Sequence, residues 1–332
     1  MKPAGEREVP LKQCSRRFKS FDYFFGLQER VVSLVVPELR RGLQYDSMKP
    51  PRNLISDSVL VQEAAELLHN CGGYATAAEI VDAVFKLSNI DSQLAVGLIA
   101  DLIGGDPRFE VLESGNVNLL QRDHDARLLS ATEFVVVDVE ATGARLLPCR
   151  LIEIGAYRVT DGKIVAKFET LLNPGTPIPR FIRTLTGISD DLVRNAPVFN
   201  DVAEEWLDFA GDSVLVAHNA PFDLRVLNQE VGRAFPGYRM GNCSLCTITL
   251  ARQLVPELER YRLDAVADHF GIEIAARHRA GSDALATAQI LIRLLEKLDE
   301  FGIEDLGAAR RFRLNPEARA PRGHEAQLAF DV

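Results

Sequence analysis

The feature that most constrains the fold is a run of four apolar residues, 134–137 (FVVV), that is followed by two acids, Asp138 and Glu140. A short run rich in β-branched residues is typical of a buried strand. Side chains alternate along a strand, so residues two positions apart point to the same face. The pattern therefore predicts a strand whose carboxyl end presents two carboxylates together, although either acid alone would also be typical of a solvated strand end.

A second apolar run, 213–217 (SVLVA), predicts another buried strand, and residues 218–223 (HNAPFD) follow it. Proline is favourable in the first turn of a helix, so Pro221 predicts that Asp223 lies in the opening turn of a helix after this strand. The helix dipole alone would favour an acid there. We expect His218 and Asn219 to shape the loop rather than to take part in chemistry.

The third group contains His278 and Asp283, which are separated by a short segment with Gly281 and Ser282. Apolar residues at helical spacing over 283–292 predict an amphipathic helix with Asp283 in its first turn. Neutral histidine titrates near working pH and can accept a proton from water. A histidine between two arginines is more often a solvated residue, so the neighbouring acid is what makes His278 a candidate.

Four carboxylates and one histidine from three separate segments form a chemically coherent set. Open α/β sheets bind ligands at the carboxyl ends of their strands, and hard divalent cations prefer oxygen ligands. Two such cations held by carboxylates, with a base beside them, can hydrolyse a phosphodiester. The residues therefore predict a two-metal hydrolytic site in an α/β domain.

The ordered motifs DxE at 138–140, HNAxFD at 218–223 and HxAxxDA at 278–284 resemble the three exonuclease motifs of the DnaQ-like family, in the subgroup with a histidine before the last aspartate (DEDDh). The resemblance covers roughly residues 131–297 and includes IEIGA at 152–156, LTGIS at 185–189 and YRLD at 261–264. It implies an α/β, RNase H-like exonuclease fold, with a mixed central sheet flanked by helices. It also implies a 3′→5′ exonuclease similar to the proofreading subunit or domain of bacterial replicative polymerases.

The resemblance further implies a role for each site residue. His278 would be the general base, and Thr142 and Gly143 would contact the terminal nucleotide. Two Mg²⁺ or Mn²⁺ ions would be held by four acids: Asp138, Glu140, Asp223 and Asp283. The chain departs from the family where Cys246-Thr247 replaces the usual acid-threonine pair, and we expect no loss of catalysis from this change.

Residues 56–122 predict a separate, winged-helix-like module that precedes an exonuclease domain over 131–300. The first helix is expected over 56–69. A capping box at Thr76 and Glu79 predicts the beginning of a second helix that runs to residue 87. A third helix over 91–103 is followed by a hairpin over 109–120. Winged helices often bind DNA through the third helix. The third helix here has no lysine or arginine and the module is acidic, so protein contact or nuclease positioning is favoured over DNA binding.

The two ends of the chain are predicted to lie outside these domains. Residues 1–55 are interpreted as a helical extension, with Met48 as an alternative start of the native chain. Residues 301–332 are interpreted as a flexible tail. Its end, with Gln327, Leu328 and Phe330, resembles the short peptides that dock on the bacterial sliding clamp; an ordinary ragged terminus is the alternative.

Composition is consistent with a cytoplasmic enzyme. The 332 residues are 47% hydrophobic, and no apolar run approaches the roughly 20 residues of a membrane span. The five cysteines have no regular spacing, and the single CxxC at 243–246 does not predict a zinc site. A net charge of −9 predicts weak, local binding of nucleic acid, with processivity supplied by a partner.

Three functions are compatible with these patterns. The leading one is a DNA 3′→5′ exonuclease that acts in proofreading or repair on single-stranded or frayed 3′ ends. The second is an RNA exonuclease, because discrimination depends on contacts to the 2′-hydroxyl. The third is a replication-associated scaffold without activity, against which the full set of five site residues argues. The sequence contains no polymerase, so proofreading would require one in trans.

Overall fold

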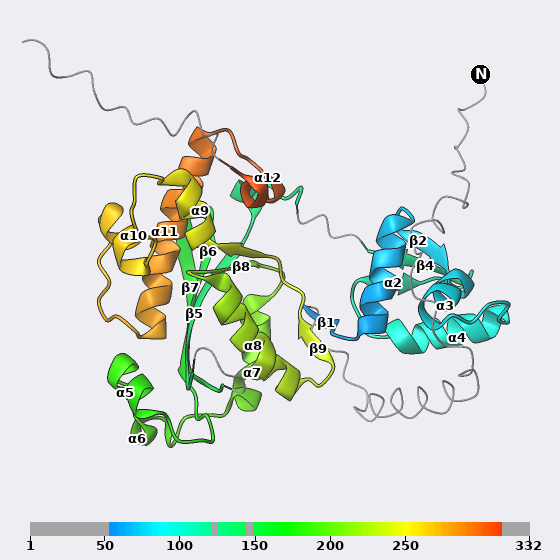
Figure 1. The fold of residues 1–332 in the computed structure, drawn as a ribbon, viewed down its shortest axis with the longest axis horizontal. Helices are drawn as coiled ribbons and strands as arrows, with labels where there is room; N and C mark the ends of the chain where they lie inside the picture. The colour runs from blue at the N-terminus through cyan, green and yellow to red at the C-terminus, as the bar shows by residue number, and fades with distance from the viewer. Residues whose placement is uncertain (1–52, 121–124, 144–148, 314–332) are drawn as a thin grey trace, which may run out of the picture. The chain divides into compact units, whose positions relative to one another are not determined.

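The computed structural model describes residues 53–120, 125–143 and 149–313 (Figure 1). The chain divides into two compact units, a smaller one from residues 54–122 with Pro236–Tyr238 and a larger one from most of the remaining residues. The helix expected within residues 1–52 and the clamp-like peptide near residue 330 lie outside the described residues. The tail predicted to be flexible over 301–332 is not flexible throughout, because residues 306–311 form a helix whose Leu306 is buried in the core. None of the described helices combines the length and apolar composition that crossing a membrane requires.

A five-stranded mixed sheet forms the centre of the larger unit, with the strand order β10-β8-β5-β6-β7. Strand β5 pairs in parallel with β8 and antiparallel with β6, while β10 is parallel to β8 and β7 antiparallel to β6. The strands are β5 (Phe134–Ala141), β6 (Leu151–Thr160), β7 (Lys163–Leu171), β8 (Val214–Ala217) and β10 (Ser244–Cys246). This mixed sheet and its flanking helices confirm the predicted fold class.

Helices flank this sheet, and α11 packs along β5 and β6, with α9 and α10 against α11 (Figure 1). Helix α8 packs on β5, and α7 packs on α8. The helices are α5 (Arg180–Thr186), α6 (Asp190–Val193), α7 (Phe199–Ala210), α8 (Ala220–Ala234), α9 (Thr247–Leu254), α10 (Leu263–His269), α11 (Ala280–Glu300) and α12 (Leu306–Arg311), with a 3₁₀ turn, η2 (Leu129–Ala131), and a short strand, β9 (Tyr238–Met240).

One face of β5 carries both core and candidate site residues. Phe134 and Val136 are fully buried in a cluster with Leu291 and Leu294 of α11. Two and four residues further along the same face are Asp138 and Glu140. Burial of the apolar half of this face holds β5 against α11, so the two acids lie beside the beginning of that helix.

The smaller unit contains helices packed on a three-stranded antiparallel sheet with the order β2-β4-β3. Its elements are β1 (Leu54–Ser56), α2 (Val59–Asn70), β2 (Tyr74–Thr76), α3 (Ala77–Phe85), α4 (Ser92–Ile103), β3 (Phe109–Val111) and β4 (Asn116–Leu119). The capping box of Thr76 and Glu79 is confirmed. The first helix begins at Val59, after strand β1, and not at Ser56 as predicted, and the predicted hairpin gains β2 as a third strand.

Candidate active site

Strand β5 presents Asp138 and Glu140 on one face, as predicted. The strand runs on to Ala141, so both acids lie within the sheet and not after it. Glu140 faces Glu153 across the ladder with β6, and Asp138 faces Gly155. The backbone of a paired strand therefore fixes the separation of the two carboxylates.

Asp223 lies in the first turn of α8, with Pro221 at the start of that helix, as predicted. Only 3% of its surface is exposed. Its Oδ1 accepts a hydrogen bond of 3.3 Å from the backbone N–H of Val139, the residue between the two acids of β5. This bond places the third carboxylate next to the two acids of β5.

Asp283 lies in the first turn of α11 and is 5% exposed. Its Oδ2 accepts a hydrogen bond of 3.0 Å from the backbone N–H of His278. Its Oδ1 has no hydrogen bond, and Arg277 Nε lies 3.8 Å away. His278 occupies the loop before α11 with a φ of 58°, a left-handed conformation that is uncommon for a residue other than glycine.

These segments meet in space. Glu140, His278 and Asp283 each offer one ligand atom, and the three atoms lie within 4.8 Å of one another. Asp138, His278 and Asp283 line one pocket of about 520 Å³. The rest of its lining is His218, Ile248, Arg252, Tyr261, Arg262, Leu263 and Arg277.

The electrostatics of this cluster favour a bound cation. Burial, followed by the charge of Asp223, raises the pKa of Asp138 well above its ordinary value. Burial and the Asp283 carboxylate raise the pKa of Glu140 to about 8. Burial also raises the pKa of Asp223 and Asp283. Carboxylates that resist ionisation together, one of them with an unbonded buried oxygen, are the oxygen-rich environment that a hard divalent cation neutralises.

Thr142 and Gly143 follow the end of β5 and do not line this pocket. Thr142 exchanges two hydrogen bonds with Arg150, at 2.8 Å from its backbone N–H and at 2.9 Å to its hydroxyl. These bonds close the base of the loop between β5 and β6. The contact of Thr142 and Gly143 with a nucleotide stays a prediction.

His218 is held on both sides, as expected for a residue that shapes the loop. Its Nδ1 lies 2.9 Å from the Thr247 hydroxyl and its Nε2 lies 3.0 Å from the Tyr261 carbonyl oxygen. Burial lowers the pKa of His218 to about 4. A neutral imidazole with both nitrogens hydrogen-bonded is a structural part of the pocket wall.

Cys246, the last residue of β10, is a half-buried free thiol. Burial acts to raise the pKa of its thiol, but hydrogen bonds, first from the Thr249 backbone, outweigh burial and lower it. The neighbouring Thr247 bonds through its hydroxyl to His218.

Sequence reasoning missed the role of Glu153, which is 7% exposed and binds the segment beside His278. The signal was present, because an acid inside the apolar run 151–156 is unusual unless it has a partner. That partner is Arg279, on the C-terminal side of His278, for which the sequence analysis proposed no role.

A mixed sheet whose central strand carries part of a carboxylate cluster is compatible with a hydrolytic enzyme of the α/β class, and comparisons with known proteins specify the family. The exonuclease family (RNase_T) matches residues 135–291. DNA polymerase III subunit epsilon of Aquifex aeolicus is 39% identical over 201 residues, which are 60% of this chain and 97% of that protein. The chain therefore belongs to the exonuclease family that includes polymerase III epsilon subunits.

Two further relatives are similar over about half of the chain. DNA polymerase III PolC-type of Caldanaerobacter subterraneus subsp. tengcongensis is 43% identical over 174 residues, 52% of this chain and 12% of that protein. The chain thus spans about an eighth of the length of this PolC-type relative. The solved structure of Exonuclease X in complex with 5′ overhanging duplex DNA is 29% identical, with a TM-score of 0.42, over 51% of this chain and 93% of that one.

Proposed function

We propose that this protein is a 3′→5′ exonuclease that releases nucleoside 5′-monophosphates from DNA 3′ ends during proofreading or repair. The observation that carries the proposal is that Asp138, His278 and Asp283 line one pocket, while Glu140 lies beside His278 and Asp283 and Asp223 bonds to the backbone between the two acids of β5. The likeness to a nearly full-length epsilon subunit supports it, because that relative is a subunit of a DNA polymerase.

We propose Asp138, Glu140, Asp223 and Asp283 as the ligands of two Mg²⁺ or Mn²⁺ ions. Their oxygen donors, burial and mutual repulsion fit this role. Bound metal would make a water molecule more acidic and would stabilise the charge on the leaving 3′-oxygen.

His278 would accept the proton of the attacking water and pass it to solvent. It lines the pocket beside Asp138 and Asp283, so its ring is near the phosphodiester that the carboxylates would position. Thr142 and Gly143, at the end of β5, would orient the terminal nucleotide.

Arg252 and Arg262 line the pocket, and each would bind one phosphate of the strand. Arg252 lies against the ring of Tyr261, 5.9 Å from its centroid, and Arg262 is paired at 3.7 Å with Asp264. Both side chains are exposed to solvent. These cations would give an acidic chain a local grip on a polyanion.

The direct test is release of mononucleotides from matched 3′-labelled single-stranded DNA and RNA with Mg²⁺, Mn²⁺ or EDTA. We expect metal-dependent degradation of DNA that is slower by about 10²- to 10⁴-fold in the His278→Ala variant. A preference for RNA would transfer the activity to RNA turnover or maturation. A folded protein that degrades neither polymer would exclude the proposal and favour a scaffold.

A proofreading role would require a polymerase partner in the cytoplasm, and the tail would supply a contact to the sliding clamp. Gln327, Leu328 and Phe330 would dock in the clamp pocket, and the acidic, winged-helix-like module over 56–122 would position the nuclease through protein contact. Binding of purified clamp should be lost in the double variant Leu328→Ala, Phe330→Ala. If the unmodified chain does not bind clamp, this part of the proposal fails and the nuclease assignment stands.

A further inference from the structure

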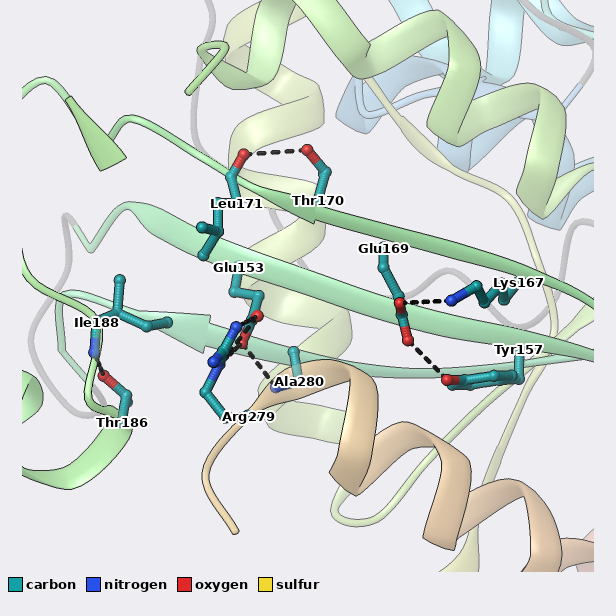
Figure 2. Close-up of polar contacts among 10 residues, drawn as sticks. All are labelled: Glu153, Tyr157, Lys167, Glu169, Thr170, Leu171, Thr186, Ile188, Arg279 and Ala280. Carbon is teal, nitrogen blue, oxygen red and sulfur yellow. Dashed lines mark hydrogen bonds and ion pairs between the residues drawn. The ribbon is translucent and has the colours of Figure 1, made fainter. Parts of the chain in front are cut away.

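His278 lies between two arginines that are tied to different elements of the fold. On one side, Arg279 donates to the carboxylate of Glu153 on β6, with distances of 2.7 Å from Nη2 and 3.1 and 3.2 Å from Nε (Figure 2). On the other side, Arg277 Nη1 lies 3.2 Å from Asp264 in α10. The backbone on both sides of His278 is therefore attached to the body of the domain.

Glu153 also determines where α11 begins. The first N–H groups of a helix have no partner inside the helix. The N-cap residue of α11, Arg279, makes no capping hydrogen bond through its side chain. Glu153 instead accepts a hydrogen bond of 2.8 Å from the backbone N–H of Ala280, the first residue of the helix (Figure 2).

The register of β5 and β6 connects this anchor with the β5 carboxylates. Glu153 is paired with Glu140, and Gly155, two residues further on the same face, is paired with Asp138. A Cβ at Gly155 would lie 2.3 Å from the carbonyl carbon of Ala280, so a glycine is required for α11 to approach β6. The same two pairs thus set the position of the β5 acids and of the beginning of α11.

Stability alone does not explain a glutamate at this position. A buried ion pair generally stabilises a fold no more than well-packed apolar residues do. The negative charge of Glu153 also acts against ionisation of Glu140 opposite to it. Its distinctive property is instead a geometric one, since the planar carboxylate binds both Arg279 and the N–H of Ala280.

The backbone of His278 requires such an attachment. Its φ of 58° is disfavoured for a residue with a side chain and persists only where the surroundings hold it. The hydrogen bond from its N–H to Asp283 closes the turn on the inner side. The pairs of Arg277 and Arg279 hold the two flanks.

We infer that Glu153 is a positioning residue that acts through Arg279 and Ala280 to hold His278 in its working position beside the carboxylate cluster. The pair of Asp264 and Arg277 is the second attachment of the same loop. This inference rests on the proposed nuclease function for its kinetic readout. Its structural readout is independent of that function.

The first experiment compares Glu153→Gln with a matched control, Glu133→Gln. Glu133 also lies beside β5 and pairs with an arginine, Arg158, at 3.5 Å, but it lies at the opposite end of the strand. We expect Glu153→Gln to lower kcat by roughly 10- to 100-fold, as for a catalytic group displaced by about 1 Å, with KM within about threefold. The control should resemble the wild type, and an unchanged kcat in Glu153→Gln would overturn the inference.

A double-variant cycle tests whether Glu153 acts through His278. Single-turnover rates with excess enzyme are measured for His278→Ala with and without Glu153→Gln. If Glu153 only positions His278, the second substitution changes the already low rate by less than about twofold. A full additional loss would show that Glu153 acts on the fold or on the carboxylates and not through His278.

The third readout is amide hydrogen exchange of residues 277–283 in metal-free protein. Loss of the attachment should speed exchange in this segment in Glu153→Gln and leave β5 and β8 unchanged, with Glu133→Gln as the reference. If Glu153→Gln does not fold, Arg279→Gln removes the same pair from a side chain that is 42% exposed and should give the same result. Unchanged exchange in a folded variant would refute the attachment, whereas a wild type without nuclease activity would refute only the proposed function.

Discussion

At the scale of single residues, the carboxylates and the histidine of the site differ in their environment. Asp138, Glu140, Asp223 and Asp283 are carboxylates whose ionised forms are disfavoured by burial. Each is positioned by the backbone of β5, α8 or α11, so ordering these side chains around a cation costs little conformational entropy. His278 is the one site residue held in a left-handed backbone conformation.

Substitution of His278 should remove the base and keep the ligands. General-base catalysis typically contributes 10²- to 10⁴-fold, so we expect His278→Ala to lower kcat by about that factor. Asp138→Ala should abolish nucleotide release because it removes a proposed ligand. Circular dichroism should report an intact fold for both variants. Near-normal rates in either variant would show that its role is wrongly assigned.

Removal of metal should make stability depend on pH. The pKa of Glu140 in the folded state is raised to about 8 from an ordinary value of 4.5. Below about pH 4.5 both states hold the proton, and as pH rises towards about 8 only the folded state retains it, so folded-state stability falls over this window. The thermal midpoint in EDTA should therefore fall from about pH 5 to about pH 8.

Metal should counteract that fall, because it stabilises the ionised carboxylates of the folded state. Saturating Mg²⁺ or Mn²⁺ should raise the thermal midpoint more at about pH 8 than at about pH 5. Glu140→Gln should show a shallower pH dependence in EDTA than the wild type. The same midpoint shift at both pH values would argue against the carboxylate cluster as the metal site.

At the scale of elements, the structure depends on how closely α11 approaches the sheet. Gly155 permits contact between β6 and the first residue of α11, and Glu153 caps the helix from the same strand. The strand and the helix thus support the segment that carries His278 and Asp283.

Gly155→Ala should disturb this support. The added Cβ would lie 2.3 Å from backbone atoms of Ala280, which cannot rotate away, so we expect a loss of about 1–3 kcal/mol in the free energy of unfolding. Urea denaturation measures this loss. Gly97→Ala is the control, because its Cβ would meet no atom within 4 Å in helix α4 and should be neutral or stabilising.

Elements that depend on local patterns were predictable from the sequence. The apolar runs identified β5 and β8, Pro221 identified the beginning of α8, and the Thr76 capping box identified the beginning of α3. Features that depend on distant pairing were not. Helix α11 begins at Ala280, three residues before the predicted helix, because its cap comes from β6 and not from the preceding residues.

At the scale of the whole molecule, a net charge of −9 coexists with a nuclease pocket. The contrast is resolved locally, since Arg252, Arg262 and Arg277 line the same pocket as Asp138 and Asp283. Binding of nucleic acid would then depend on a few cations and be weak, which agrees with a need for a partner.

The double variant Arg252→Ala, Arg262→Ala should weaken binding with little effect on chemistry. The logarithm of the affinity falls with the logarithm of the salt concentration, and each lost phosphate contact to a single strand makes this slope shallower by about 0.7. We expect KM to rise, kcat to stay near the wild-type value, and the salt dependence of KM to become shallower by about 1.4. An unchanged salt slope would mean that these arginines do not contact the strand, and the exposed Arg293→Ala serves as the control.

The firmly bonded ring of His218 has a consequence for enzyme kinetics. Two histidines line the pocket, but His218 has its pKa lowered to about 4 and keeps both ring nitrogens engaged across the neutral range. A rate-versus-pH profile with a limb between about pH 6 and pH 8 therefore cannot report His218. Such a limb would have to come from another group of the site.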